Sequence, residues 1–529
     1  MNIKLRFLIQ RCTLYTLLLL SFIAFIGCAS LPSDVSRTPS YALQNTSSAE
    51  LGKHIEPLLQ AHPNESGFHA LSRGIEALAA RLVLMQDAEM SIDAQYYMWH
   101  DDLSGKAMHQ QLLKAADRGV RVRLLLDDLD TAGKENTLHL INAHANIEIR
   151  LFNPFANRNM RAGDFITDTS RVNHRMHNKT LTIDNQVTVF GGRNIGDEYM
   201  GAAEEVGFSD LDAMAIGPIA QEISNAFDVY WNSQWVYPLD AFAEGEPVTK
   251  DAVATFRKQL TAYIDTAQMG DYAKAMSALS LLDVTSINDI QFEWGRWVLV
   301  YDASSKVDAK AVTKETHLAP QLKQGLDRAQ NEIIIVSPYF VPGSQFAEYL
   351  VDRVSDGVSV RILTNSLAAN DVALVHSGYM RYRKQLIAGG VELFEYRTIK
   401  SSEKVGSKNA EDGSSWKGAE RTSLHGKYFA FDQRDVFIGS FNLDARSVEL
   451  NTELGVYFES PAYAQALHNA FDGNIAGKAY RVLLDDNGKL VWEADDNGKV
   501  IRYSHEPDTS LWKRLSTRFL SWFVPESQL

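Results

Sequence analysis

The twelve-residue stretch NHRMHNKTLTID, residues 173–184, carries a motif that this chain contains twice. The motif is a histidine, any residue, a lysine, four further residues and an aspartate, and it recurs in HGKYFAFD at residues 425–432. A single copy of so short a pattern can arise by chance in a chain of 529 residues. Two copies 248 positions apart, each within a similar run of surrounding sequence, indicate a duplicated catalytic unit.

The sequence around each motif repeats as well, and in the same order. The shared landmarks are GVRVRLLL and GVSVRIL (residues 119–126 and 357–363), GGRN and GSFN (191–194 and 439–442), and NAFD (225–228 and 469–472). Equivalent landmarks lie 238 to 248 residues apart, so few insertions separate the copies. In each copy strand-like runs alternate with helical ones, which predicts an α/β fold of two related α/β/α sandwiches.

The motif places a histidine and a lysine on one face of the chain. Alternate side chains of an extended backbone point the same way, so His177 and Lys179 share a side while Asn178 points to the other. An imidazole can attack phosphorus to form a phosphohistidine, or protonate a departing alkoxide, and two copies can divide these roles. The lysines supply positive charge where phosphoryl oxygens gain charge in the transition state. The predicted catalytic residues are His177, Lys179, His425 and Lys427.

Four further polar residues complete the predicted site. Asn194 and Asn442, at the ends of the two glycine turns, can donate neutral hydrogen bonds to the same oxygens, so the chemistry requires no metal and no other cofactor. A nucleophilic histidine also needs an acidic partner on its second ring nitrogen, to fix its tautomer. We predict that each histidine is held from its own half, the second by Glu453 in NTEL and the first by Asp210 in FSDL.

Over about residues 66–478 the chain resembles the phospholipase D superfamily, and within it the bacterial cardiolipin synthases, most closely the C type. The most specific part is the first motif, residues 173–184, followed by GGRNIGDEY at 191–199. The resemblance implies two halves that meet in one pseudo-two-fold active site, with the first-half histidine as nucleophile and the second-half histidine as general acid. It also implies that Asp184 and Asp432 support the motif backbone and do not touch substrate.

Length, charge and composition limit the classes of protein. A chain of 529 residues suits two domains with appendages, and 45% hydrophobic with 22% charged residues is ordinary for a globular protein. The net charge of −14 disfavours a general nucleic-acid binder. Locally, Arg171, Arg175 and Arg193 can join Lys179 in gathering one phosphate.

The N-terminus has the pattern of an export signal. Three basic residues precede an apolar run at 14–26, which is shorter than the ~20 residues that span a bilayer, and GCAS follows at 27–30. A bacterial lipoprotein signal fits best, with residues 1–27 removed and Cys28 lipidated, although Phe25 stands where leucine is usual; an uncleaved anchor is the alternative. We therefore expect attachment to a membrane of a Gram-negative-type envelope, facing the periplasm, with inner or outer membrane left open. The only other cysteine, Cys12, leaves with the signal, so no internal disulfide can form.

Composition and turn signals divide the rest of the chain. The expected parts are a polar tether (28–65), the first half (66–245), a connecting insertion (246–310) with a helix at 251–267 and a strand at 297–301, the second half (311–478), and a C-terminal region (479–529). Asn-Gly turns predict a three-stranded meander at the start of this last region.

Two aromatic segments each admit two interpretations. The expected final helix, residues 511–523, has aromatic and leucine side chains on one face and Lys513, Arg514 and Arg518 on another. It either lies at a lipid interface or packs against the core of the protein. The aromatic run at 96–99 either lines an entrance for acyl chains or is simply buried.

These observations predict a membrane-anchored phosphatidyltransferase that makes cardiolipin from two phospholipids through a phosphohistidine. Phosphatidylglycerol would be the acceptor, and phosphatidylethanolamine or phosphatidylglycerol the donor. The alternatives are a phospholipase D or phosphodiesterase that uses water as acceptor, an exported nuclease, which the acidic charge disfavours, and a lipid-binding scaffold with idle motifs. The expected partners are phospholipid substrates and a membrane surface, without nucleic acid; an accessory protein and self-association are left open.

Overall fold

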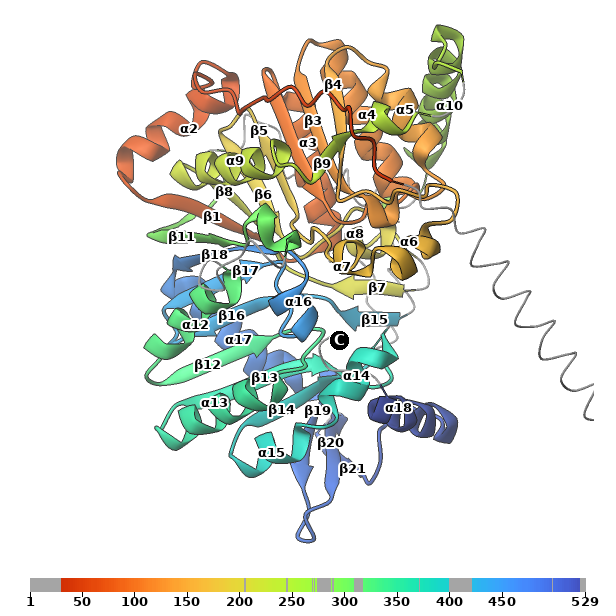
Figure 1. The fold of residues 1–529 in the computed structure, drawn as a ribbon. Coiled ribbons are helices and arrows are strands. Elements are labelled where there is room, and N and C mark those ends of the chain that lie inside the picture. Colours follow the sequence, from red (N-terminus) through yellow and green to blue (C-terminus); the bar gives the residue numbers. More distant parts are fainter. Residues whose placement is uncertain are drawn as a thin grey trace, which may run out of the picture.

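The computed structural model describes residues 30–529 apart from 204–205, 244–245, 269, 271, 274–286, 288–289, 309–316, 371, 399–420, 497 and 524–529. Two mixed β-sheets, one above the other in Figure 1, form the body of the protein. The expected signal peptide, residues 1–27, and Cys28 lie outside the described residues.

The first sheet has nine strands and the second has ten. In spatial order the first contains β10 (Glu293–Gly295), β1 (Ser66–Leu71), β8 (Asp212–Ile216), β6 (Val187–Gly191), β5 (Thr180–Ile183), β2 (Ser91–Tyr96), β3 (Arg121–Asp127), β4 (Ile147–Phe152) and β9 (Val236–Pro238). The second contains β11 (Trp297–Tyr301), β18 (Leu454–Glu459), β17 (Asp435–Gly439), β16 (Tyr428–Phe431), β12 (Glu332–Val336), β13 (Ser359–Asn365), β14 (Glu392–Tyr396), β19 (Ala479–Leu484), β20 (Leu490–Asp496) and β21 (Lys499–Tyr503).

Six strands occur in the same order in both sheets, which confirms the predicted duplication. The order β8-β6-β5-β2-β3-β4 in the first sheet matches β18-β17-β16-β12-β13-β14 in the second. In each, the last three strands are parallel and the others antiparallel. The strands β2 and β12 are buried along their whole length, as central strands covered on both faces must be.

Helices cover both faces of each sheet, so each half is an α/β/α sandwich. On the first sheet α3 (Gly74–Asp87), α4 (Leu103–Asp117) and α5 (Glu135–Asn142) cover one face and α9 (Pro218–Trp231) the other. On the second, α12 (Leu318–Arg328), α13 (Gly343–Ser355) and α15 (Arg383–Ala388) cover one face and α17 (Pro461–Lys478) the other. The shorter helices are α6 (Arg161–Thr167), α7 (Thr169–Val172), α8 (Asp197–Met200), α14 (Ala373–Tyr379) and α16 (Ala445–Glu449).

One hydrophobic cluster joins the two halves. It combines side chains of β1, β8 and α9 from the first half with those of β17 and β18 from the second. At its centre Phe68 and Phe458 stack with their ring centroids 4.2 Å apart. Because this shared core is buried, it holds the two halves together and so fixes the faces that carry the two motifs.

The chain passes from one half to the other along adjacent strands. After α10 (Lys250–Gln268), β10 pairs with β1 in the first sheet, and β11, one residue further on, pairs with β18 in the second. At the C-terminus, β19, β20 and β21 form an antiparallel meander that extends the second sheet beside β14. The helix α18 (Leu511–Phe523) follows the meander.

The segment expected to be a polar tether is partly a docked element. Residues 50–61 form helix α2 (Glu50–Ala61), whose Leu51 and Ile55 are buried in the first-half core. Upstream, the side chain of Asp228 accepts a hydrogen bond from the backbone of Ala42, and Arg150 donates to the carbonyl of Thr38. The polar segment at residues 38–61 is therefore hydrogen-bonded to and packed against the first half. The prediction of a free tether is wrong for these residues.

Candidate active site

Each motif histidine lies where the two halves meet, which we call the seam. The backbone of each histidine is hydrogen-bonded to the other half. The His177 N–H donates to the carbonyl of Thr452 at 2.8 Å, and the His425 N–H donates to the carbonyl of Ser209 at 2.8 Å. The short strand β15 (Arg421–Leu424), just before His425, pairs in parallel across the seam with β7 (Val206–Ser209), and Met176, just before His177, forms an isolated parallel bridge with Thr452. Neither half can therefore complete its own motif alone.

The acidic partners are also exchanged between the halves. Nδ1 of His177 lies 2.9 Å from Oε2 of Glu453, and Nδ1 of His425 lies 2.5 Å from Oδ2 of Asp210. The sequence prediction named the correct two acids but paired each with the wrong histidine, because it assumed that a repeat unit is self-contained. With both Nδ1 atoms held by carboxylates, Nε2 is the ring nitrogen that remains for chemistry in each histidine, and in His425 it lies 3.3 Å from the Lys427 Nζ.

The two carboxylates are supported differently. Glu453 accepts hydrogen bonds from the hydroxyls of Ser440 and Ser447, and the Ser440 carbonyl lies 3.2 Å from Nδ1 of His177. At the matching position the first half has Gly192, where a Cβ would lie 2.3 Å from a carboxylate oxygen of Asp210. The Asp210 carboxylate thus occupies the space that the Ser440 side chain fills at the equivalent position of the second half. Sequence reasoning missed both serines, although Ser440 stands in the repeated glycine turn that contains Asn442.

Burial sets the charge of these groups. The histidines and both carboxylates are buried. Burial lowers the pKa of His177 to about 4, against the opposing effect of Glu453, and burial together with the Lys427 charge lowers the pKa of His425. Burial raises the pKa of Glu453, but its interactions with His177 and Lys179 outweigh this and lower it overall. At neutral pH the first histidine is therefore an uncharged imidazole beside an ionised acid.

Both lysines lie within electrostatic reach of both histidines, which brings the two motifs to one site. The pKa of His177 and that of His425 are each lowered by Lys179 and by Lys427. Burial lowers the pKa of Lys179 itself to about 7. Its Nζ donates to the His177 carbonyl at 2.6 Å, and the Lys427 Nζ donates to the His425 carbonyl at 2.5 Å. A phosphate beside Lys179 would favour the charged form of this desolvated amine.

Aromatic rings wall the site. The Tyr97 ring lies 5.0 Å from the His177 ring and 5.4 Å from the Lys179 Nζ. Tyr199 and Phe208 lie 5.0 and 5.1 Å from the His425 ring. Of the aromatic run at 96–99, Tyr97 is thus at the site, whereas Tyr96 and Trp99 are buried in the first-half core.

Asn194 and Asn442 each lie three residues after the end of a strand, β6 and β17 respectively. Both are buried, and within the described part of the chain their Oδ1 atoms have no hydrogen-bond partner. A buried amide without a partner is unfavourable unless a ligand completes it. An amide oxygen only accepts hydrogen bonds, as do the phosphoryl oxygens of a phosphodiester, so these Oδ1 atoms do not test the predicted donation from the two side-chain NH2 groups, which stays a prediction.

The motif aspartates face away from the reacting groups. The Asp184 carboxylate accepts hydrogen bonds from the backbone N–H groups of residues 89–91, and the Asp432 carboxylate accepts from those of residues 330–332. Each aspartate also has a positive φ, as does the residue after it, which is the conformation of a two-residue hairpin turn. These contacts agree with the supporting role that the family resemblance implied.

Replacement of Asp184 by alanine is expected to destabilise the fold. Asp184 is fully buried, so the variant leaves three backbone donors without an acceptor, and we expect a loss of about 3 kcal/mol in the free energy of unfolding. The Asp432→Ala variant has the same positive-φ strain but a more exposed carboxylate, so its loss should be about 1 kcal/mol. Urea denaturation of both variants measures the difference. Equal losses would contradict this account of the motif aspartates.

The arginines expected to gather phosphate are instead structural. Arg193 donates to the backbone carbonyls of residues 71, 72, 199 and 210, and Arg175 pairs with Asp127. Arg171 pairs with Asp168 and donates to Asn153 and Pro154. Most of their donors are used to hold loops, so the prediction that these three arginines gather a phosphate is wrong.

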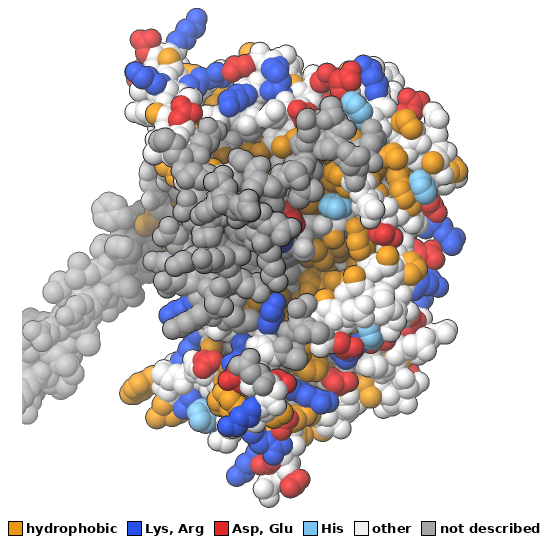
Figure 2. Space-filling view, turned by 180° about the vertical axis from the view of Figure 1, so that it is seen from behind, with side chains coloured by type: hydrophobic (Ala, Val, Ile, Leu, Met, Phe, Trp, Pro, Cys, Tyr) orange, Lys and Arg blue, Asp and Glu red, His pale blue; other side chains and the backbone are white. Residues whose placement is uncertain are grey.

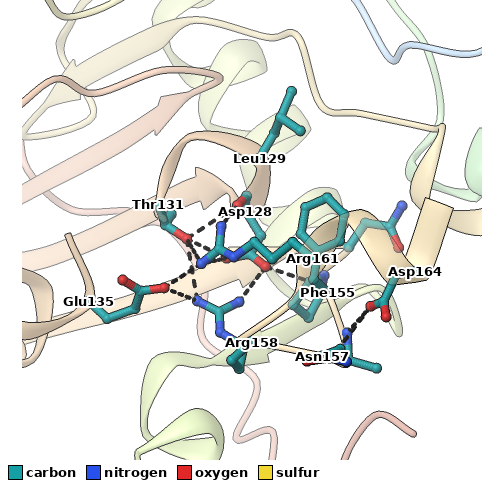
Figure 3. A network of polar contacts seen from close by, with 12 residues as sticks. Asp128, Leu129, Thr131, Glu135, Phe155, Asn157, Arg158, Arg161 and Asp164 are labelled. Carbon is teal, nitrogen blue, oxygen red and sulfur yellow. Dashed lines mark hydrogen bonds and ion pairs between the residues drawn. The ribbon is translucent and has the colours of Figure 1, made fainter. Parts of the chain in front are cut away.

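A network of ion pairs positions the segment before the first motif. Figure 3 shows Arg158 and Arg161 converging on Asp128, Glu135 and Thr131 at the end of β3. The adjacent Asp127 accepts from the Met176 N–H at 2.7 Å, one residue before the histidine. Consecutive aspartates at one strand end thus anchor α6 and the motif together.

The fold and the seam define a protein of the phospholipase D type, with one active site assembled from two related halves. Its sequence matches the family described as "Cardiolipin synthase, PLD-like domain" over residues 82–231 and 322–475. The chain belongs to this family, which confirms the resemblance and makes it a phospholipase D-type phosphatidyltransferase.

Two relatives and one solved structure show how far the similarity extends along the chain. The chain is 41% identical to Cardiolipin synthase C of Escherichia coli (strain K12) over 472 residues, which covers 89% of this chain and 98% of the relative. It is 30% identical to an uncharacterised protein of Helicobacter pylori (strain ATCC 700392 / 26695), covering 97% and 99%. Among solved structures, phosphatidylserine synthase from Haemophilus influenzae Rd KW20 superposes with a TM-score of 0.53 at 14% identity, covering 90% of this chain and 100% of that chain, and supports the fold alone.

Proposed function

We propose that this protein makes cardiolipin by moving a phosphatidyl group from one phospholipid to another. Phosphatidylglycerol is the acceptor, and phosphatidylethanolamine or phosphatidylglycerol is the donor. The proposal rests on one observation above all, the two buried histidines whose Nδ1 atoms are held by carboxylates from opposite halves. It draws further support from the similarity to Cardiolipin synthase C.

In the first step Nε2 of His177 attacks the donor phosphorus. A P–N bond forms, the P–O bond to the headgroup breaks, and His425 gives its proton to the departing headgroup oxygen. The anionic phosphodiester offsets the lysine charges that depress the pKa of His425, so substrate binding favours the protonated acid. The ionised Glu453 stabilises the positive charge that develops on His177.

In the second step a primary hydroxyl of phosphatidylglycerol replaces the histidine. His425 accepts the hydroxyl proton, a new P–O bond forms, and the P–N bond breaks to regenerate His177. Lys179, Lys427, Asn194 and Asn442 hold the phosphoryl oxygens in both steps. One phosphodiester is exchanged for another, so the reaction needs no nucleotide. Lipidation of Cys28 on the periplasmic side would keep the site beside both substrates.

The lipids of cells that express the chain test this function. In a bacterial strain without its own cardiolipin synthase, the intact chain should produce cardiolipin and the His425→Ala chain should produce none, at equal protein levels. Extracted lipids are separated and identified by mass spectrometry. Phosphatidic acid in place of cardiolipin would indicate that water is the acceptor, and unchanged lipids in both strains would refute the assignment.

A further inference from the structure

The C-terminal helix α18 turns its apolar face to solvent. Five of the fourteen large hydrophobic side chains exposed among the described residues belong to this one helix. They are Leu511, Trp512, Leu515, Phe519 and Trp522, and the two tryptophans are 81% and 75% exposed. Figure 2 shows hydrophobic side chains at the lower left edge, where α18 lies. The interpretation in which this stripe packs against the core is therefore wrong.

The opposite side of α18 attaches the helix to the second half. The helix packs against α14, Thr517 is buried, and Arg381 donates to the carbonyl of Ser521. Ser510 caps its start by accepting a hydrogen bond from the Lys513 N–H at 3.1 Å. The exposed apolar face thus belongs to a helix that is itself held in place, which makes it a surface for contact.

The charge of the helix is complementary to an anionic surface. Residues 511–523 contain Lys513, Arg514 and Arg518 and no acidic residue, in a chain whose net charge is −14. Lys513 and Arg514 are half-buried, and Arg518 is exposed. Two further arginines are exposed nearby: Arg381, which is hydrogen-bonded to α18, and Arg421, which lies close enough to affect Lys513. An apolar stripe between basic side chains is the pattern of a helix that lies in the headgroup region of a bilayer.

The position of α18 connects this face with the active-site seam. Arg421 is the first residue of β15, the strand that leads to His425. In Figure 1 α18 lies on the right-hand edge below β15, and α6 of the other half lies on the same edge above β7. The helix α6 also exposes apolar side chains, Phe165 and Ile166. Exposed apolar side chains of both halves thus belong to helices that lie on the same edge of this view as the paired strands β7 and β15.

We propose that the apolar face of α18 inserts into the surface of an anionic phospholipid bilayer, with its basic residues on the headgroup phosphates, and so turns the seam toward the lipid. This contact is separate from the lipid on Cys28 and does not depend on which acceptor the reaction uses. A surface anchored only by a tether would leave the site free to face any direction, whereas a docked helix fixes its orientation.

Tryptophan quenching by brominated lipid tests the insertion without any turnover. The full-length chain is reconstituted in vesicles of phosphatidylethanolamine and phosphatidylglycerol with brominated acyl chains, and compared with a Trp512→Phe/Trp522→Phe variant. Because these two tryptophans are exposed, phenylalanine preserves the fold and the apolar surface. We expect quenching of the unchanged chain, and loss of most of it in the variant. Equal quenching of the two chains would overturn the proposal.

Aspartate substitutions on the apolar face of α18 distinguish insertion of the helix into the bilayer from simple closeness of the helix to its surface. The Leu515→Asp/Phe519→Asp variant should lose the quenching, whereas Val500→Asp, at an equally exposed apolar position of β21, should retain it. Added salt, or vesicles of phosphatidylcholine, should weaken quenching of the unchanged chain. If quenching is absent in every vesicle while the Asp variants disrupt self-association or binding to another protein, the face is a protein interface and the proposal is wrong.

Discussion

The Asp210→Asn and Glu453→Gln variants are each expected to lose about 1,000- to 10,000-fold in turnover, as when the acid of a catalytic histidine becomes an amide. Both carboxylates are buried, and each lies within hydrogen-bond distance of Nδ1 of one histidine. The amides would keep the shape of the site but remove the charge that fixes the tautomer. Transfer between purified lipids in mixed micelles measures the loss.

Because each acid holds the histidine of the other half, the two variants should lose activity in different steps: Asp210→Asn in the steps that use His425, and Glu453→Gln in the attack by His177. A donor lipid with a p-nitrophenol headgroup needs no proton on departure, so it bypasses the general acid in the first step. If Asp210 serves His425, release of p-nitrophenolate in the first turnover of the Asp210→Asn variant should be about as fast as in the unchanged enzyme, whereas later turnovers stay slow because His425 is also the base of the second step. If Glu453 serves His177, the Glu453→Gln variant should stay slow with this donor, because its nucleophile is impaired.

The Ser209→Ala variant is a suitable control for these experiments, since only the carbonyl of Ser209 holds His425. It should keep the activity of the unchanged enzyme with both donors. Rescue of Glu453→Gln in place of Asp210→Asn would show that each half pairs its own acid and histidine. Rescue of both variants would mean that neither acid acts on the nucleophile.

Much of the fold could be predicted because it is repeated. Landmarks that recur at nearly constant separation identify two copies of one unit, and the matching order of six strands in each sheet confirms this. The residues brought to the seam were predictable for a similar reason. An acid in the same place of both copies, such as Asp210 and Glu453, stands out from the many solvated acids of the chain.

The exchange of partners was not predictable in the same way. A sequence repeat shows which residues correspond, but not whether a side chain completes its own copy or the other one. That choice depends on β7 and β15 pairing across the seam, a contact between residues more than 200 positions apart. A contact between segments so far apart in the sequence leaves no local sequence pattern from which it could be predicted.

The predictions that failed for polar residues share one physical cause. Polar residues were interpreted as solvated or as ligands for substrate, yet Arg193 satisfies backbone carbonyls and the backbone of Ala42 satisfies Asp228. Hydrogen-bond partners of this kind are distant in sequence, so composition cannot identify them. Conversely, the apolar face of α18 follows a clear helical pattern, but the pattern alone cannot show whether protein covers it.

The second large expected effect is the accumulation of the covalent intermediate in a variant that cannot complete the second step. In the His425→Ala variant the acceptor hydroxyl has no base, so a phosphatidyl group transferred from the p-nitrophenol donor should stay on the enzyme. We expect a nearly stoichiometric adduct in this variant, and none when His177 is replaced by alanine as well. The unchanged enzyme should show only a transient adduct, because the second step removes it.

Mass spectrometry of the adduct tests most directly whether one histidine at a shared seam is the nucleophile. The His425→Ala enzyme is mixed with the p-nitrophenol donor, quenched in base to preserve the P–N bond, and digested. The account predicts a phosphatidyl group on the peptide that contains His177, in an amount equal to the p-nitrophenolate released in the first turnover. Modification of any other residue, or turnover of the donor by the His177→Ala enzyme, would contradict it.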